Sequence, residues 1–375
     1  MQKNRVSKVV IIGAGIFGVS TGLQLARRGI EVTIVNDGPP ANGASGRSLS
    51  WLNSSRMRSQ AYHRLRMAGI DRYRTLKARQ PDADWLSFDG GLTWDADDET
   101  NEIEAAYRHE VSLAYDALHL APDAVAKITP GVDARAITRQ GAIFNPGEGW
   151  VDLPKLIGVL LAEFAERGGT LVTDSGRASV VVEGGRALGA STSSGTVYRG
   201  DVVLLATGPS VPKMVAEAGQ RIDDATPVSL LVTTRPVELP LKAVLNTPRV
   251  AIRPAPEQRF VLDAAWSEEE VVETSEGNYE VRAETLEGLL AEASRVLEGN
   301  PRLELEGYGV GRKPIPGDGE PVFGELKAIR SYFVAFSHSG ATLGLIAGEL
   351  LAFEIATGEK HPMLANFRPE RFEAA

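Results

Sequence analysis

The run VVIIGAGIFGVSTGLQLARRGIEVTIVND, at residues 9–37, constrains the fold of this chain more than any other feature. An apolar run at 9–12 leads into a glycine turn, a helical pattern follows at 17–28, and a second apolar run follows at 32–35. Strand, turn, helix and strand in this order predict a βαβ unit with the turn spacing GxGxxG.

Each glycine of the turn has a mechanical reason. Gly13 permits a tight turn out of the strand, Gly15 lets the backbone approach a pyrophosphate, and Gly18 lets the helix pack closely on the strand. The N–H groups at the start of the helix then face the phosphates. The pattern predicts a dinucleotide site, but the glycines alone do not distinguish a nicotinamide from a flavin.

The end of the second strand is the position from which an acid commonly binds the adenosine ribose, about 20 residues after the glycines. Asn36 holds this position here and can both donate to and accept from a hydroxyl, whereas Asp37 comes one residue later and faces the other way. No arginine follows directly to bind a 2′-phosphate, which argues against NADP.

Composition excludes several other chemistries. The 375 residues suffice for two lobes, and the absence of cysteine rules out disulfides, thiolate nucleophiles, iron–sulfur clusters and cysteinyl flavin. A net charge of −9 makes nucleic acid an unexpected partner, and the five histidines lack metal-ligand spacing, so no metal is predicted. The apolar runs are shorter than the ~20 residues of a membrane span, and no leader pattern precedes the first strand, so we expect a cytoplasmic protein.

The rest of the chain alternates helical and strand-like patterns without an internal repeat. A buried strand that runs into Ala206, Thr207 and Gly208 has small residues typical of close approach to a ligand. The other expected elements are a helix at 62–77, a hairpin at 86–97, acidic helices over 98–123, a helix within 151–172 that ends at Gly168 and Gly169, an antiparallel sheet over 227–263, a charged stretch leading into a helix over 267–297, and a strand, turn and helix over 331–358.

Six motifs occur in one order along nearly the whole chain. They are VVIIGAGIFG at 9–18, GAS at 43–45, GWVDLPKL at 149–156, VVLLATG at 202–208, RKPIPGDGEPVFG at 312–324 and YFVAFSHSGATLG at 332–344. In this order they resemble the D-amino-acid oxidase family of FAD enzymes, the group that includes glycine oxidase and sarcosine oxidase. The resemblance, and not the glycine turn, favours a flavin.

The resemblance implies an α/β fold with a Rossmann-like FAD-binding lobe and a second α+β substrate lobe built on an antiparallel sheet. Both lobes are then discontinuous in sequence. We expect the FAD-binding domain at 1–85, 145–225 and 308–375, and the substrate domain at 86–144 and 226–307.

The resemblance also implies a set of residues that bind FAD non-covalently. Asn36 stands where the family has a ribose-binding glutamate, Ala178 where its backbone touches adenine, and the turn at 340–342 where backbone N–H groups face the N1 and O2 side of the flavin; His338 is a further candidate. The expected set is Gly13, Gly15, Ile16, Phe17, Gly18, Asn36, Asp37, Ser45, Gly46, Arg47, Ser48, Leu49, Ser50, Ala178, Thr207, Gly208, Ser339, Gly340, Ala341 and Thr342.

For the substrate, the family places an arginine in an Arg-Pro pair where it grips the substrate carboxylate. The matching residue is Lys313, with Arg312 just before it, so either Lys313 acts as a point charge or Arg312 supplies the bidentate contact. Trp51 falls where the family lines its substrate pocket, although it is equally consistent with an ordinary core residue. Weaker candidates are Arg56, Arg58, Tyr62, His63, Arg259 and Trp266.

The resemblance implies an amine or amino acid oxidase that transfers hydride from the substrate α-carbon to flavin N5, with O2 as the expected acceptor. The imine product is then hydrolysed to an oxo acid. Alternatives are an FAD-dependent dehydrogenase of a 2-hydroxy acid or amine that uses another acceptor, a flavin-binding subunit of a larger complex, and, least favoured, a nicotinamide enzyme.

Overall fold

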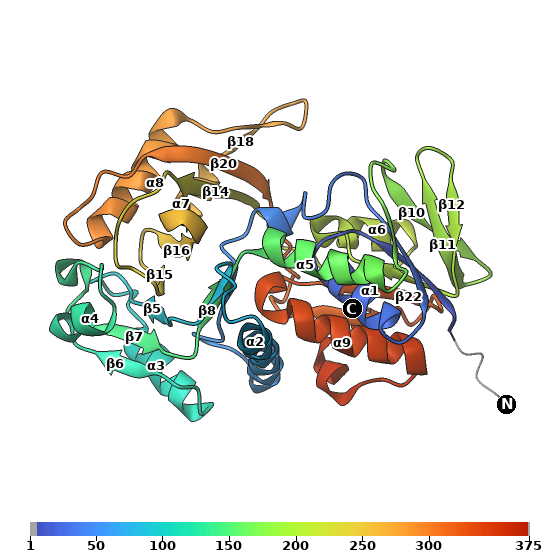
Figure 1. The fold of residues 1–375 in the computed structure, drawn as a ribbon, viewed down its shortest axis with the longest axis horizontal. Coiled ribbons are helices and arrows are strands. Elements are labelled where there is room, and N and C mark those ends of the chain that lie inside the picture. Colours follow the sequence, from blue (N-terminus) through green and yellow to red (C-terminus); the bar gives the residue numbers. More distant parts are fainter. Residues whose placement is uncertain (1–5, 374–375) are drawn as a thin grey trace. The chain divides into compact units, whose positions relative to one another are not determined.

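The computed structural model describes residues 6–373, and these form two compact units (Figure 1). Each unit is assembled from separate stretches of the chain. Unit 1 contains the residues up to Gly46, Leu153–Pro227 and those from Arg312 onward, and unit 2 contains Arg47–Asp152 and Val228–Gly311.

The boundaries differ from the expected ones mainly at residues 47–85 and 145–152, which belong to unit 2, and by a few residues at 226–227, which belong to unit 1, and at 308–311, which belong to unit 2. The reason is a small sheet that the sequence did not reveal. Its three strands, in the order β3-β8-β4, are β3 (Trp51–Leu52), β8 (Gly149–Val151) and β4 (Leu86–Ser87). Gly90 N–H donates to the Glu148 carbonyl at 3.0 Å, which ties this sheet to the neighbouring strand of unit 2.

Unit 1 is built on a six-stranded sheet whose strands are all parallel except the edge strand β21. The four residues Val9–Ile12 are buried on both faces of the sheet, which is why they read as a continuous apolar run. In spatial order the strands are β21 (Val322–Glu325), β22 (Tyr332–Phe336), β13 (Val202–Leu205), β1 (Lys8–Ile12), β2 (Glu31–Val35) and β9 (Thr170–Val172).

Two layers cover this sheet (Figure 1). On one face α1 (Ile16–Ala26) packs against α5 (Leu153–Glu166) and α9 (Gly340–Thr357). On the other face Val10, Val203 and Leu205 pack with the second layer in one apolar cluster. That layer consists of α6 (Val211–Glu217) and the antiparallel strands β10 (Ala178–Glu183), β11 (Arg186–Thr192) and β12 (Val197–Arg199).

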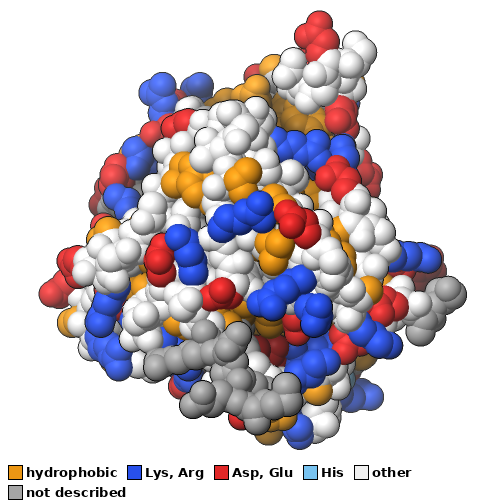
Figure 2. Space-filling view, turned by 90° about the vertical axis from the view of Figure 1, so that its right-hand side faces the viewer, with side chains coloured by type: hydrophobic (Ala, Val, Ile, Leu, Met, Phe, Trp, Pro, Cys, Tyr) orange, Lys and Arg blue, Asp and Glu red, His pale blue; other side chains and the backbone are white. Residues whose placement is uncertain are grey.

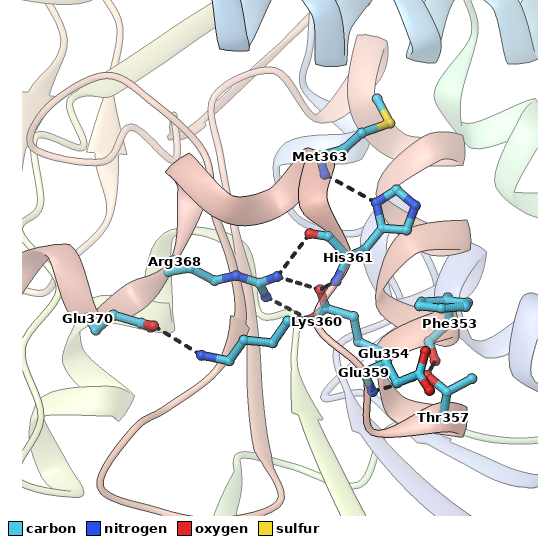
Figure 3. A network of polar contacts seen from close by, with 9 residues as sticks. All are labelled: Phe353, Glu354, Thr357, Glu359, Lys360, His361, Met363, Arg368 and Glu370. Carbon is cyan, nitrogen blue, oxygen red and sulfur yellow. Dashed lines mark hydrogen bonds and ion pairs between the residues drawn. The ribbon is translucent and has the colours of Figure 1, made fainter.

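Helix α9 is apolar and long enough to cross a membrane, yet 67% of its apolar window is buried inside the protein. A side chain at Gly348 would collide with Ser20 of α1, so the two helices lie in close contact. Its C-terminal half is fixed by a buried ion pair, in which Arg368 donates to both carboxylate oxygens of Glu354 at 2.7 and 2.6 Å (Figure 3). Burial and these contacts make α9 a core helix of unit 1.

Unit 2 is built on an eight-stranded sheet in which β15 pairs with β5 in parallel and the other pairs from β14 to β6 are antiparallel. Its order is β20 (Leu305–Arg312), β14 (Val228–Thr234), β17 (Arg259–Asp263), β16 (Ala251–Ala255), β15 (Val244–Asn246), β5 (Gly91–Thr93), β7 (Ala142–Asn145) and β6 (Leu118–Leu120). The other elements of the unit are α2 (Gln60–Arg79), α3 (Ile103–Ser112), α4 (Pro122–Ile128), α7 (Ala265–Glu269), α8 (Ala283–Val296) and the pair β18 (Val272–Glu273) and β19 (Tyr279–Glu280).

Two expectations for unit 2 are wrong. The stretch 86–97 is not a hairpin, because β4 pairs with β8 whereas β5 pairs with β7 and β15 in the large sheet. The stretch 98–123 is not all helix, because strand β6 lies between α3 and α4 and pairs with β7. In both cases the secondary structure depends on pairing with strands distant in sequence, which local residue patterns do not reveal.

Candidate active site

The glycine turn of unit 1 has the geometry that its spacing predicts. Gly13 has φ +109°, and a Cβ there would lie 2.4 Å from the Ala206 carbonyl oxygen. A Cβ on Gly18 would lie 2.0 Å from the Gly13 carbonyl oxygen. Both contacts are to backbone that cannot move away without distorting the sheet, so both positions require glycine.

The loop after β2 returns to the start of α1. Ser45, in the short 3₁₀ turn Ala44–Gly46, accepts a hydrogen bond from Ile16 N–H at 3.1 Å. Its hydroxyl also lies 3.2 Å from the point where a Gly15 Cβ would be. The second motif of the sequence is thus brought to the N–H groups that open the helix, where an anionic group binds favourably.

The end of β13 lies on the other side of the same turn. Ala206 N–H donates to the Ile12 carbonyl at 2.8 Å, and the Ala206 carbonyl is the group that a Gly13 side chain would strike. Thr207 and Gly208 follow directly, and Gly208 has φ +57°. The small residues after this strand therefore lie beside the glycine turn.

The C-terminal motif completes this side of unit 1. Gly340 opens α9, and a Cβ there would lie 3.5 Å from Ile16 Cγ2 and 3.9 Å from the Phe17 ring. Ala341 and Thr342 form the first turn and are buried. The N-termini of two long helices, separated by more than 300 residues in sequence, therefore lie side by side and present the positive ends of their dipoles together.

Asn36 joins this arrangement in an unexpected way. Its Oδ1 accepts from Ala14 N–H at 2.9 Å and its Nδ2 donates to the Gly38 carbonyl at 2.7 Å, so the side chain links the glycine turn to the loop after β2. Asp37 is exposed and accepts from Asn42. Ala178 is buried at the start of β10, in the cluster that contains Ile12 and Val35.

These residues fit a bound FAD, because close backbone approach, small side chains and two helix N-termini meet at the carboxyl ends of parallel strands. A family model described as FAD dependent oxidoreductase (DAO) matches residues 8–354, which is most of the chain. The chain belongs to this family. It is an FAD-dependent oxidoreductase, as the order of its motifs predicted.

Relatives of the protein have similar sequences and folds. The chain is 31% identical over 213 residues to glycine oxidase from Pseudomonas aeruginosa, a match that covers 54% of this chain and 55% of that relative. It is 24% identical to glycine oxidase from Geobacillus kaustophilus over 92% of this chain and 91% of that one. The crystal structure of the Geobacillus enzyme has the same fold, with a TM-score of 0.82, 21% identity, and coverage of 97% and 99% of the two chains.

The remaining expected FAD-binding residues begin unit 2. Arg47 lies along β20, where side chains at Gly309 and Gly311 would contact it. Ser48 Oγ accepts from Ser50 N–H at 3.0 Å, Leu49 lies between them, and Ser50 accepts from Val151 N–H. Contacts within unit 2 thus fix this loop, and its role toward FAD stays a prediction.

The expected substrate residues lie in two places. Trp51 is in β3 and pairs with Trp150 of β8, so it belongs to unit 2. Arg312 ends β20 and is exposed, whereas Lys313 is half-buried and donates its N–H to the Pro227 carbonyl at 3.0 Å within unit 1.

The weaker candidates of unit 2 have structural contacts. Arg56 forms an ion pair with Asp95, and Arg259 with Glu257 and Glu306. The others lie as follows: Arg58 over the ring of Tyr62, His63 Nδ1 at 2.8 Å from Ser54 Oγ, and Trp266 Nε1 donating to the Arg249 carbonyl.

Sequence reasoning missed a set of buried ionisable groups in unit 2. Glu148 accepts from the Tyr115 hydroxyl, and burial raises the pKa of Glu148 to about 8. Burial also raises the pKa of Glu110, which accepts from Arg56 N–H at 2.7 Å. Arg253 is buried in the middle of β16. The sequence contains one signal for Arg253, namely a single charge within the apolar strand pattern VAIRPA at 250–255. It contains none for Glu110 and Glu148, whose surroundings in the sequence are typical of surface residues.

Proposed function

We propose that the protein oxidises the C–N bond of a small amino acid or secondary amine of the glycine, sarcosine or D-amino acid type. FAD, held non-covalently, would accept at N5 the hydride of the substrate α-carbon, and water would hydrolyse the imine product to an oxo acid and ammonia or a primary amine. Molecular oxygen is the proposed acceptor of the electrons and the cytoplasm the proposed location.

One observation carries the proposal. Within unit 1 the glycine turn, Ser45, the end of β13 and the start of α9 meet at one place, although they are far apart in sequence. The names of the two relatives support an amino acid as the substrate class, since both are glycine oxidases.

Bound FAD would supply a hydride acceptor, and the tasks left to the chain are binding, orientation and electrostatics. The first turn of α9 would place its N–H groups, at the positive end of the helix dipole, where negative charge is stabilised. No general base is required if the amine binds uncharged. A residue that holds the substrate in place therefore contributes more than a residue that moves a proton.

Lys313 is the proposed carboxylate-binding residue, with Arg312 as the alternative. The backbone of Lys313 is fixed by the Pro227 carbonyl, and Ile315 N–H donates to Thr226 Oγ1 two residues on, so the Lys313 side chain starts from a defined position. A lysine binds a carboxylate as a point charge, which requires less precise geometry than the fork of an arginine.

The substrate class is tested by anaerobic titration of the flavin absorbance with glycine, sarcosine, D-amino acids and secondary amines. We expect at least one of these amines to bleach the flavin. Bound flavin that no amine and no amino acid bleaches would contradict the proposal, and bleaching by 2-hydroxy acids alone would favour the dehydrogenase.

The carboxylate role is tested with the double variant Lys313→Ala/Arg312→Ala. We expect at least a roughly 10-fold higher concentration for half-bleaching by carboxylate substrates, because a charge-assisted hydrogen bond is lost, with the flavin content unchanged. Lys327→Ala removes an exposed cation of unit 1 and serves as the control. An unchanged half-bleaching concentration in the double variant would reject the assignment.

The acceptor is tested separately, by following hydrogen peroxide in air-saturated buffer during turnover. We expect one peroxide per amine oxidised. Turnover only with a dye or quinone, and with no peroxide, would show a dehydrogenase.

A further inference from the structure

The two faces of the eight-stranded sheet in unit 2 differ in character. Residues on one face belong to an apolar cluster with Leu286, Leu289 and Leu290 of α8. Cross-strand pairing places Leu92, Leu245, Ile252, Leu262 and Val232 in one row on this face. Because side chains alternate along a strand, the adjacent row points to the opposite face.

That adjacent row contains two polar residues, Asn145 and Arg253. Pairing aligns Asn145 with Gly91 and Val244, and Arg253 with Val261. The Glu148 carboxylate and the Trp51 indole pack over Gly91 in this row, because a side chain at Gly91 would collide with both. The face without α8 therefore carries a guanidinium, two indoles and a carboxyl group.

Arg253 is the unusual member of this face. The residue is only 4% exposed, its Nη1 donates to the adjacent Pro254 carbonyl at 3.1 Å, and its guanidinium lies 5.2 Å from the centre of the Trp150 ring. Among residues 6–373 it has no ion-pair partner, and its buried Nε–H meets no acceptor. Burial lowers the pKa of Arg253 to about 10, which still leaves it charged at neutral pH.

Trp150 adds a second donor beside the first. Its side chain is buried and its indole N–H also meets no acceptor in the described part of the chain. Buried donors are normally satisfied, because an unmade hydrogen bond is costly, and a buried cation normally has a counter-charge. An apolar residue at position 253 would fill the same place in the strand without a buried unpaired charge and without an unmade hydrogen bond. The pair is therefore better explained by binding an anion than by stability.

Neither of two acids that bear on Arg253 forms an ion pair with it among the described residues. Asp152 is half-buried, and its negative charge partly opposes the effect of burial on the pKa of Arg253. Glu148 accepts from Tyr115 and from Ser54 N–H, and its raised pKa keeps it largely protonated at neutral pH.

We propose that Arg253 and the Trp150 indole N–H bind a carboxylate of the substrate, so that amines carrying a second carboxylate are preferred. The inference rests on the proposed amine oxidation and adds its substrate class. It concerns a carboxylate other than the one assigned to Lys313. Trp51, the pocket residue implied by the resemblance, pairs directly with Trp150 within unit 2.

Binding without turnover is the first test. Succinate and propionate differ by one carboxylate, and neither is an amine, so their dissociation constants for the holoenzyme can be measured from the change in flavin absorbance or in melting temperature. We expect succinate to bind at least roughly 10-fold more tightly than propionate to the wild type, and at most about 2-fold more tightly to Arg253→Met. Equal preference in both proteins would overturn the proposal.

Matched variants separate recognition from folding. Arg259→Met removes a half-buried arginine of the adjoining strand β17, which is paired with Glu257 and Glu306, and should leave the succinate preference unchanged. Trp150→Phe keeps an aromatic six-membered ring and removes the N–H-bearing part of the indole, and should weaken succinate binding by roughly 3-fold or more. If Arg253→Met does not fold, Arg253→Lys takes its place. Its preference for succinate over propionate should be weaker than that of the wild type but stronger than the limit of about 2-fold expected for Arg253→Met. Unchanged preference in both Arg253→Lys and Trp150→Phe would likewise contradict the assignment.

Turnover is the second test, with sarcosine and iminodiacetate as a pair that differs by one carboxylate. Under anaerobic conditions iminodiacetate should bleach the wild-type flavin at a concentration at least roughly 10-fold lower than sarcosine does, and this advantage should disappear in Arg253→Met. Loss of the same size for both substrates would reject a specificity role. If neither bleaches the flavin while the succinate preference depends on Arg253, then the proposed reaction fails and the anion site stands.

Discussion

Single residues determine how closely the chain segments of unit 1 can approach one another. Gly18 is the clearest case, because the Gly13 carbonyl oxygen would lie only 2.0 Å from an added Cβ. Gly22, one turn later on the same helix, would instead meet the ends of the Ile34 and Ile11 side chains, at 3.0 and 3.4 Å. The first contact is with rigid backbone and the second with side chains that can adjust.

We therefore expect Gly18→Ala to weaken FAD binding by roughly 10-fold or more and to lower the free energy of unfolding by about 1–3 kcal/mol. Gly22→Ala is the matched control, since it adds the same methyl group and should keep its flavin. Flavin titration and urea unfolding measure both effects. Equal FAD affinity in the two variants would show that the close approach at Gly18 has no bearing on the cofactor.

Glu148 gives a prediction about pH. Burial raises its pKa from 4.5 to about 8, so the folded protein holds a proton that the unfolded chain releases between these values. The contribution of Glu148 to stability is present below pH 4.5 and is lost as pH rises toward 8, by at most about 1.4 kcal/mol per pH unit. Glu148→Gln should remove this slope, because the amide carries no titrating proton.

Urea unfolding at pH 5.5, 7 and 8 would measure the difference between the wild type and Glu148→Gln. We expect the variant to gain stability relative to the wild type as pH rises. A difference that stays constant across this range would mean that Glu148 ionises at its ordinary pKa in the folded protein.

At the scale of elements, α9 connects the candidate site to the C-terminal segment. Its first turn lies beside the start of α1, and its C-terminal half is held by the Glu354–Arg368 pair (Figure 3). The same carboxylate accepts from His361 N–H at 2.7 Å, so the chain after the helix is fixed at two points. The pair thus holds the segment after residue 360 against the helix.

Breaking this pair should be costly, because a buried charge without its partner is strongly unfavourable. We expect Arg368→Met to lower the free energy of unfolding by about 3–5 kcal/mol and Arg368→Met/Glu354→Leu to recover much of that loss. The matched control is Lys360→Met, which removes the exposed ion pair with Glu370 and should cost at most about 1 kcal/mol. A similar loss in Arg368→Met and Lys360→Met would contradict a structural role for the buried pair.

Much of the element order could be predicted from local patterns. The βαβ unit, the helix of α5, and the strand and helix at the C-terminus are confirmed, because their periodicity and glycine turns are local signals. The strand pairing was not predictable, since β4 and β5 have different partners although only the three residues 88–90 separate the two strands. For the same reason, Arg253 could be recognised as buried only once β16 was placed inside a sheet.

At the scale of the whole molecule, both units depend on segments that are distant in sequence, and unit 1 alone contains three of them. A ligand that contacts several segments of one unit stabilises the folded state by mass action. The charge distribution on the surface is consistent with an enzyme that acts on a small molecule. On the face drawn in Figure 2, basic and acidic side chains of the described residues are interspersed and do not gather into one basic patch.

FAD should therefore stabilise the protein measurably. Apoprotein prepared by removing flavin in acid or high salt should melt at a higher temperature once FAD is restored, by an amount equivalent to about 2.7 kcal/mol at a concentration 100 times the dissociation constant. Riboflavin lacks the pyrophosphate and adenosine and serves as the control ligand. Equal stabilisation by both would show that the glycine turn does not contribute to binding.

The most direct test of the central claim is the flavin content of the purified protein. We expect an absorbance band near ~450 nm and, after denaturation, release of one FAD per chain into the supernatant with none left covalently attached. A colourless protein that takes up no added FAD would contradict the account, because the residues that meet in unit 1 would then bind no flavin.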